Sequence, residues 1–206
     1  MKRMIAAILI AFFTFAPFGF TSTPSPANSI LPLYTNDGKQ IVCTAFVINT
    51  EKRYLMTADH CIAVVEQPMV KGVNAWEVGH YPMLDISILE APAAYQLPAL
   101  RVRPADAPLS YDEPITMYGF ASGHTRLKVM DGKTIFPIIT VANLPRIFTL
   151  YRPSAISGMS GGPVLDTNNR VVTIIMQGKD DADLSISTEM NQIYEATKEF
   201  WESNGQ

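Results

Sequence analysis

The sequence predicts an all-β fold, either a barrel or a sandwich, and two observations support this prediction. Short runs of β-branched and apolar residues recur from about Ile30 onward, with turn-forming residues between them. The fifteen prolines and twelve glycines are spread along the chain, which suits many short strands joined by turns. Runs at this spacing without intervening helices favour an all-β class. The predicted strands are 41–48, 54–58, 74–78, 84–89, 115–120, 134–141, 146–150, 162–165 and 171–176.

One helix is predicted, at the end of the chain. Apolar residues there recur at the three- and four-residue spacing of one helix face, and Ser187 or Thr188 is suited to cap its start. We expect this helix to dock its apolar face on the preceding β structure. The residues of that face are Met190, Ile193, Tyr194, Thr197, Phe200 and Trp201.

Residues 1–27 have the pattern of an export signal. Lys2 and Arg3 supply the positive start, and residues 4–20 are mostly apolar. The next residues turn polar, and Ser25-Pro26-Ala27 offers small residues for cleavage. We therefore expect a mature chain that is secreted or periplasmic. The alternative is an uncleaved membrane anchor, although Pro17 and Gly19 shorten a segment that is already marginal for a span.

Composition, charge and cysteine count indicate which partners and cofactors to expect. The chain has 206 residues, of which 48% are hydrophobic and 17% are charged, with a net charge of -3. It holds no conspicuous Lys/Arg-rich patch, so nucleic acid is not an expected partner. The two cysteines, Cys43 and Cys61, follow an export signal, where an even pair predicts one disulfide. Their spacing does not suit zinc, and we expect no metal and no cofactor.

Three segments carry the residue types of an activated serine nucleophile. A serine hydroxyl attacks well when an imidazole takes its proton and a buried carboxylate orients that imidazole. Glycines beside the serine allow a tight turn that leaves amide N–H groups free for a developing oxyanion. The segments are Thr57-Ala58-Asp59-His60-Cys61, Leu84-Asp85-Ile86-Ser87-Ile88-Leu89 and Gly158-Met159-Ser160-Gly161-Gly162-Pro163.

The order of these residues along the chain excludes two scaffolds. The pattern Gly-x-Ser-x-Gly around Ser160 also fits α/β-hydrolases, but their histidine follows the serine, and all three histidines here precede it. The subtilisin order needs an aspartate before the histidine, which leaves only Asp37 and Asp59. Asp59 adjoins His60 directly and is badly placed to orient its ring. The order histidine, aspartate, serine remains.

Asp85 is the expected carboxylate. Asp106 and Asp112 also lie between His60 and Ser160, but Asp85 opens an apolar strand, where a carboxylate is costly to bury without a partner. The other two histidines, His80 and His124, have no motif around them and are expected in exposed loops.

The three segments resemble the Thr-Ala-x-His-Cys, Asp-Ile-x-Ile/Leu-Leu and Gly-x-Ser-Gly-Gly-Pro motifs of trypsin-like, chymotrypsin-fold serine proteases. The resemblance covers about residues 30–200. It implies a peptidase domain over residues 28–206, built as two six-stranded antiparallel β-barrels with a C-terminal α-helix. The implied boundaries are 28–105 for the N-terminal barrel, 106–186 for the C-terminal barrel and 187–203 for the helix.

The resemblance also implies the catalytic roles. His60 would be general base and then general acid, Asp85 would orient it, and Ser160 would attack the scissile carbonyl. The N–H groups of Gly158 and Ser160 would form the oxyanion hole. A disulfide between Cys43 and Cys61 would lie beside His60.

The substrate-binding positions depart from the trypsin pattern. In this resemblance, the position at the base of the family's specificity pocket falls on Ser154, and Met176 and Gly178 would lie on the strand that lines the substrate. Because Ser154 is uncharged, we expect a preference for apolar or small side chains. Met159 replaces the aspartate that pairs with a new N-terminus in trypsin-type zymogens, so we expect the enzyme to fold active without that switch.

The sequence therefore predicts a secreted serine endopeptidase that cleaves protein or peptide substrates through an acyl-enzyme intermediate. We expect a monomer that needs no membrane after signal removal. Two alternatives remain: a catalytically impaired trypsin-like fold that acts as a binding or regulatory module, and a membrane-anchored processing protease.

Overall fold

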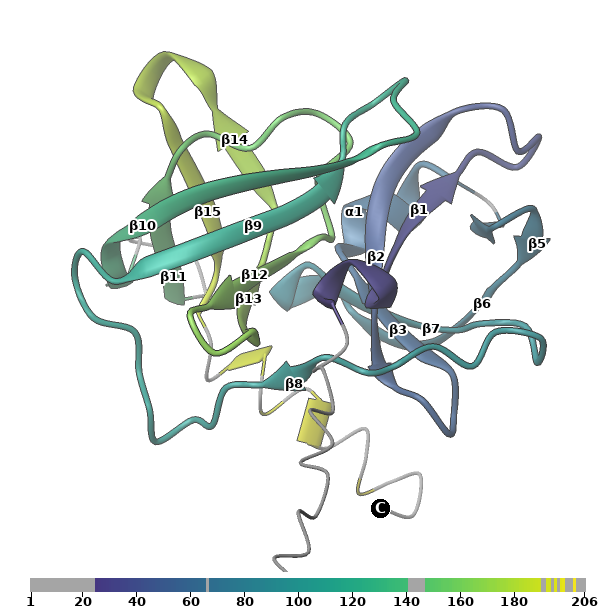
Figure 1. The fold of residues 1–206 in the computed structure, drawn as a ribbon, viewed down its shortest axis with the longest axis horizontal. Coiled ribbons are helices and arrows are strands. Elements are labelled where there is room, and N and C mark those ends of the chain that lie inside the picture. Colours follow the sequence, from purple (N-terminus) through teal and green to yellow (C-terminus); the bar gives the residue numbers. More distant parts are fainter. Residues whose placement is uncertain are drawn as a thin grey trace, which may run out of the picture.

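Two β-sheets, formed by successive halves of the chain, make up most of the structure (Figure 1). The computed structural model describes residues 25–65, 67–140 and 147–189, with six residues of the C-terminal segment. These six are Gln192, Ile193, Glu195, Thr197, Lys198 and Glu202.

The first sheet has seven strands in the order β5-β4-β1-β2-β3-β7-β6, and all neighbouring strands are antiparallel. Its central strands β2 and β3 are runs of mostly buried apolar and β-branched residues, which fits strands covered on both faces. The strands are β1 (Ile30–Tyr34), β2 (Ile41–Asn49), β3 (Tyr54–Thr57), β4 (Met69–Val70), β5 (Val73–Asn74), β6 (Trp76–Tyr81) and β7 (Ile86–Glu90). Between them lie the helix α1 (Asp59–Ala63) and the 3-10 turn η2 (Pro82–Leu84), and the turn η1 (Pro26–Ser29) precedes β1.

The second sheet has eight strands in the order β14-β15-β11-β10-β9-β12-β13-β8. Its neighbours are antiparallel except for β13 and β8, which pair in parallel. The strands are β8 (Arg101–Val102), β9 (Pro114–Phe120), β10 (Leu127–Thr140), β11 (Ile147–Arg152), β12 (Pro163–Asp166), β13 (Arg170–Ile174), β14 (Gln177–Lys179) and β15 (Leu184–Thr188). The 3-10 turn η3 (Asp180–Ala182) connects β14 to β15.

The predicted all-β class is confirmed, and the two sheets correspond to the two halves of a chymotrypsin-like double barrel. The sheets hold seven and eight strands instead of six each, because two-residue strands such as β4, β5 and β8 extend their edges. Strand β8 pairs with β13 of the second sheet, although it lies before the expected boundary at residue 105. Strands of two residues are too short to show the alternation of apolar and polar residues that predicts a strand.

Strand β10 begins seven residues before the predicted strand 134–141, at Leu127. Asp131-Gly132 has the composition of a turn, but here the strand passes through it, pairing with β9 up to Lys133 and with β11 from Lys133 onward. A Cβ atom on Gly132 would lie 1.9 Å from the carbonyl oxygen of Arg152. Glycine therefore permits a close approach of two backbones at this point of the strand.

The predicted start of the C-terminal helix is wrong. Ser187 and Thr188 belong to β15, are fully buried and pair with β11. Their hydroxyl groups donate to the carbonyl oxygens of Ile174 and Leu84, so they satisfy buried acceptors and do not cap a helix. The described residues beyond them, from Gln192 to Glu202, are helical. Ile193 is buried in the core, whereas the other apolar residues of the predicted face, Met190, Tyr194, Phe200 and Trp201, lie outside the described residues.

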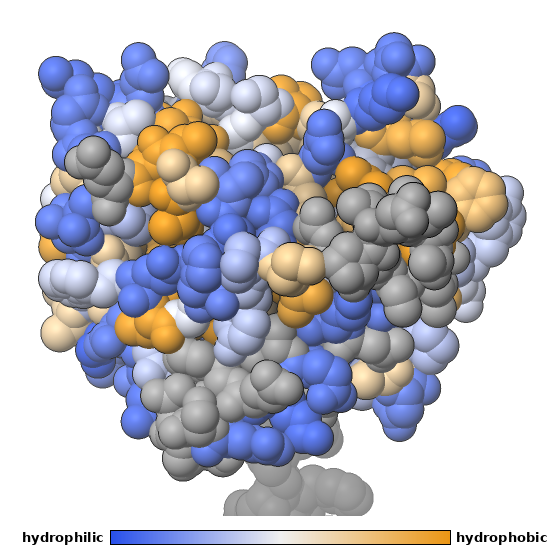
Figure 2. Space-filling view, turned by 180° about the vertical axis from the view of Figure 1, so that it is seen from behind, coloured by the Kyte–Doolittle hydropathy of each residue, from blue (hydrophilic) through white to orange (hydrophobic). Residues whose placement is uncertain are grey.

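A single hydrophobic cluster joins the two sheets. It combines Phe46 and Leu55 of the first sheet with Leu165 and Ile174 of the second, all almost completely buried. A second cluster around Met117 and Tyr151 fills the interior of the second sheet. On the face in Figure 2, hydrophilic residues separate smaller patches of hydrophobic ones. Among the residues described, no helix is long and apolar enough to cross a membrane.

Candidate active site

Helix α1 carries His60 and is anchored to the first sheet by a disulfide. The helix begins directly after β3, and its single turn contains both His60 and Cys61. Cys61 is fully buried and is bonded to Cys43 of β2, which confirms the predicted disulfide. Because the covalent link is adjacent to His60, it fixes the position of the histidine backbone relative to β2.

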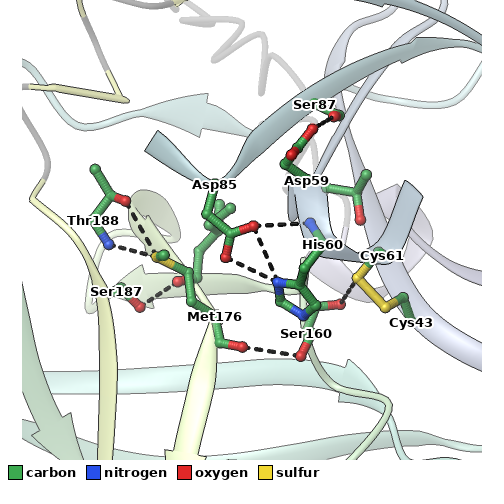
Figure 3. Close-up of polar contacts among 12 residues, drawn as sticks. Cys43, Asp59, His60, Cys61, Asp85, Ser87, Ser160, Met176, Ser187 and Thr188 are labelled. Atoms are coloured by element: carbon green, nitrogen blue, oxygen red, sulfur yellow. Dashed lines mark hydrogen bonds and ion pairs between the residues drawn. A yellow bond between two sulfur atoms is a disulfide. The ribbon is translucent and has the colours of Figure 1, made fainter. Parts of the chain in front are cut away.

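Asp85 lies at the junction of η2 and β7 and faces His60. Its backbone is left-handed, with φ 55° and ψ 46°, a conformation that aspartate tolerates better than most residues. Its Oδ1 accepts a hydrogen bond from the His60 backbone N–H at 2.9 Å, and its Oδ2 lies 2.9 Å from the His60 Nδ1 (Figure 3). One carboxylate therefore holds both the backbone and the ring of His60. The Asp85 side chain is 16% exposed and that of His60 is 47% exposed.

The loop that carries Ser160 is held by Thr44 of β2. The Thr44 N–H donates to the Ser160 carbonyl at 2.8 Å, and the Thr44 hydroxyl donates to the Gly158 carbonyl at 3.0 Å. Gly158 and Gly161 both have positive φ, 90° and 79°, which glycine adopts without steric cost. In the part of the chain that the structure describes, the N–H groups of Gly158 and Ser160 have no hydrogen-bond acceptor. Both predicted oxyanion-hole donors are thus unpaired.

The Ser160 hydroxyl donates to the carbonyl oxygen of Met176 at 3.1 Å (Figure 3). Among the described residues no hydrogen bond joins it to the His60 ring, although both side chains line the same cleft. Hydrogen bonds between catalytic groups are often long or misaligned before substrate binds. A rotation about the serine Cα–Cβ bond is the movement needed to redirect the hydroxyl.

The cleft between the two halves has a volume of about 720 Å³. The first half contributes His60 and Asp85, and all other lining residues come from the second half. These are Phe148, Ala155, Ile156, Ser157, Ser160, Met176, Gln177, Gly178, Asp180 and Ile186.

Of the predicted substrate-binding residues, Met176 and Gly178 line this cleft. Ser154 is not among the lining residues, but its hydroxyl donates to the carboxylate of Asp180, which is. A Cβ atom on Gly178 would lie 2.2 Å from the Ala155 carbonyl oxygen, so only glycine fits there. No pattern in the sequence indicated Asp180, because its proximity to Ser154 depends on how η3 folds back.

Met159, the residue before the candidate nucleophile, is fully buried in the interior of the second sheet. A Cβ atom added to Gly119 would lie only 2.8 Å from the Met159 Cβ, so the two backbones are closely packed. An apolar side chain at this position needs no charged partner.

The two other aspartates considered as partners of His60, Asp106 and Asp112, lie away from the cleft. Asp112 forms an ion pair with Lys133, and neither Asp106 nor Asp112 lines the cleft. His124 is exposed in a turn, as expected. His80 is also exposed but lies on β6 and not in a loop, a position that the short predicted strand 74–78 did not reach.

A second polar cluster lies beside α1. The Ser87 hydroxyl is 2.7 Å from both Asp59 Oδ1 and Glu77 Oε1, and the His80 Nδ1 is 3.1 Å and 3.0 Å from the same two oxygens. In a regular strand Glu77 and His80 would face opposite sides, but the pairing of β6 with β7 is irregular between residues 77 and 79. This irregularity brings both side chains to Asp59, next to His60.

The pKa of His80 is raised, mainly by its hydrogen bond to Glu77 and further by the charge of Asp59. A raised pKa means that the protonated ring stabilises the fold below pH 6.5, and that this stabilisation is lost as the pH rises through the folded-state pKa. We expect wild type to melt above His80→Gln at about pH 5 and the difference to shrink towards pH 9. The expected difference in melting temperature is small because the His80 side chain is 57% exposed, and solvent screens its interactions with Glu77 and Asp59. Melting temperatures of wild type, His80→Gln and the control His124→Gln, measured from about pH 5 to about pH 9, give this difference. A difference between wild type and His80→Gln that does not change with pH would contradict the raised pKa of His80.

An all-β double barrel whose central cleft brings together a histidine, a carboxylate and a serine defines the class of serine-type endopeptidases. A family model for the trypsin-like peptidase domain matches residues 43–174. The chain therefore belongs to the trypsin-like peptidase family.

Solved structures of serine proteases share this fold. The active form of the Rv3671c protease from M. tuberculosis aligns with a TM-score of 0.67 and 20% identity over 92% of each chain. The HtrA-type protease AlgW with a tripeptide aligns with a TM-score of 0.71 and 20% identity, over 88% of this chain and 65% of AlgW. A serine protease of a human pathogenic astrovirus aligns with a TM-score of 0.58 and 19% identity, over 79% and 89%. No curated protein sequence matches at a significant level.

Proposed function

We propose that this chain is an extracytoplasmic serine endopeptidase in which His60, Asp85 and Ser160 form the catalytic triad. The observation that carries the proposal is the bidentate contact of Asp85 with His60 in the cleft that also holds Ser160. Three distant segments meet there, each with the residue type that the chemistry requires. Protein or peptide segments are the proposed substrates, since AlgW, a structural relative, was solved with a tripeptide.

In the proposed mechanism, the Ser160 hydroxyl turns from the Met176 carbonyl and passes its proton to the His60 Nε2 while its oxygen attacks the scissile carbonyl carbon. Asp85 accepts the Nδ1–H hydrogen bond and stabilises the imidazolium that forms. The carbonyl oxygen becomes an oxyanion beside the N–H groups of Gly158 and Ser160, which are free to donate. His60 then protonates the leaving amine, and water hydrolyses the acyl-enzyme in the same way.

No aspartate–N-terminus switch is needed in this proposal. In trypsin-type zymogens an aspartate before the serine requires a new N-terminus, but here the position is the buried Met159. We therefore propose that the oxyanion loop is held by Thr44 and by the packing of Met159, without an activating cleavage.

The disulfide supports a location outside the cytoplasm, because such bonds persist in oxidising compartments. Signal removal at residues 1–27 remains a prediction, since residues 1–24 lie outside the described part of the chain. A membrane-anchored processing protease differs from the secreted enzyme in retaining this segment.

One observation favours the second candidate function, a catalytically impaired binding or regulatory module. The Ser160 hydroxyl is hydrogen-bonded to Met176 and not to His60. If this bond persists when substrate is present, the serine stays a weak nucleophile.

Reaction with a fluorophosphonate probe separates the candidates. We expect the mature protein to gain the mass of one adduct, and Ser160→Ala to gain none, because only an activated serine attacks such a probe. Intact mass spectrometry measures the adduct and locates the mature N-terminus at once. A folded wild-type protein that stays unlabelled would refute the proposed triad and favour the impaired module.

A further inference from the structure

A second pocket lies apart from the candidate active site, where β8 pairs with β13 (Figure 1). Its volume is about 510 Å³, and it shares no lining residue with the cleft that holds Ser160. Three segments form its walls: the turn η1, residues 98–101 leading into β8, and the hairpin that joins β12 to β13. Small-molecule sites usually measure about 300–1,000 Å³, so this pocket can hold a small organic molecule.

Two arginines line this pocket side by side. Arg101 of β8 and Arg170 of β13 are paired directly with each other in the parallel register. Neighbouring strands lie about 4.8 Å apart and paired residues point to the same face, so the two side chains leave the sheet together. Two positive charges at such a separation repel each other unless each has a counter-charge.

Arg170 has a carboxylate partner, and all the acceptor positions of that carboxylate are occupied. Asp166 Oδ2 lies 2.8 Å from both Nε and one terminal nitrogen of Arg170. Its Oδ1 accepts the backbone N–H groups of Asn168 and Arg170, both at 2.9 Å. Arg103 also approaches Asp166, at 3.7 Å, and forms a closer ion pair with Glu113. The two carboxylates of this region are therefore taken by Arg103 and Arg170.

Arg101 is the guanidinium group left without a counter-charge. Its side chain is exposed, and among the described residues no carboxylate lies within ion-pair distance of it. None of the described residues that line the pocket is acidic. The side-chain amides of Asn168 and Asn169 also line the pocket and have no hydrogen-bond partner in the described part of the chain. Charged and amide donors thus surround one space that offers them no acidic acceptor.

We propose that this pocket binds a small organic anion through its carboxylate or phosphate group. The planar guanidinium of Arg101 suits a bidentate contact with either group, because its N–H donors match two oxygens of an oxyanion. The amides of Asn168 and Asn169 are available to donate to further oxygens, and Pro26 and Pro98 offer apolar contact to the carbon atoms of the ligand. The anion joins the N-terminal turn to the second sheet, so its binding stabilises the folded chain. This inference does not depend on the proposed catalytic triad.

Thermal unfolding in the presence of two anions tests this binding. Melting temperatures are measured for Ser160→Ala protein, which cannot cleave itself, and for the same protein carrying Arg101→Gln or Arg152→Gln. Inorganic phosphate and citrate are each titrated, with sodium chloride holding the ionic strength constant. We expect a saturable rise in the melting temperature of Ser160→Ala protein with at least one of the two anions, because a ligand that binds only the folded state stabilises it.

Arg101→Gln should need at least about tenfold more anion for the same rise, because a charge-assisted hydrogen bond is lost. Arg152 is exposed and lines neither pocket, so Arg152→Gln makes the same change in net charge and should respond as its parent does. Isothermal titration calorimetry on the same three proteins gives the dissociation constants. A rise shared equally by all three proteins would be the general effect of such anions on folded proteins and would overturn the inference. Equal weakening in the two arginine variants, or no saturable response to either anion, would also overturn it.

Discussion

Asp85→Asn is expected to lower kcat for a peptide substrate by about 10⁴-fold while the protein remains folded. An asparagine side chain offers one acceptor oxygen and one NH₂ donor. The His60 backbone N–H already donates to Oδ1 at 2.9 Å, so the asparagine oxygen should take that place and the NH₂ group should face Nδ1. Nδ1 must then accept, which puts the ring proton on Nε2. That nitrogen can no longer take the Ser160 proton.

The matched control is Asp112→Asn. Asp112 also lies between His60 and Ser160 in the chain, but its carboxylate pairs with Lys133 away from the cleft. We expect its kcat to stay near the wild-type value. Steady-state kinetics on one fluorogenic peptide, with circular dichroism of each variant, makes the comparison. Equal losses in the two variants would remove Asp85 from the triad.

Gly161→Ala is expected to destabilise the fold by on the order of 3 kcal/mol or more. Gly161 has φ 79°, and a Cβ atom there would lie 2.2 Å from Thr57 Oγ1 and 2.3 Å from the Thr44 carbonyl oxygen. Both neighbours belong to the first sheet, so the clash falls where the two halves of the molecule meet behind Ser160. Relief requires a shift of backbone, because the Thr44 oxygen also accepts the Thr57 hydroxyl at 2.8 Å.

Gly123→Ala separates the clash from the backbone conformation. Gly123 has φ 75°, nearly that of Gly161, but nothing lies within 4 Å of a Cβ added there. Its substitution should cost only about 1–2 kcal/mol, the usual penalty of a left-handed conformation. Urea unfolding of both variants in a Ser160→Ala background, which prevents self-cleavage, measures the difference. Similar losses would show that Gly161 is required for its φ alone.

Strand β2 connects the two halves of the candidate site. Cys43 ties β2 to α1, and the next residue, Thr44, holds the loop of Ser160 through its N–H and its hydroxyl. One strand of the first sheet thus sets the position of both the histidine and the serine segments. This explains why the candidate site depends on residues that touch no substrate.

The sequence by itself was sufficient for the all-β class, the Cys43–Cys61 pairing and the choice of His60, Asp85 and Ser160 as candidates. These conclusions depend on local signals, because glycine turns, strand composition and residue order are readable without knowing which strands are neighbours. The same local signals did not predict the start of β10 or the strand β15. Gly132 allows the backbone of β10 to approach Arg152, and the buried Ser187 pairs with β11, and both features depend on the neighbouring strand.

Only the tertiary structure decided the surroundings of the candidate triad. Asp180 meets Ser154 because η3 folds back onto a segment 26 residues away, and His80 meets Asp59 because β6 is irregular next to β7. The direction of the Ser160 hydroxyl likewise depends on the Met176 carbonyl of another segment. Contacts of this kind arise from strand register and turn geometry, to which each residue contributes little alone, so no local pattern in the sequence predicts them.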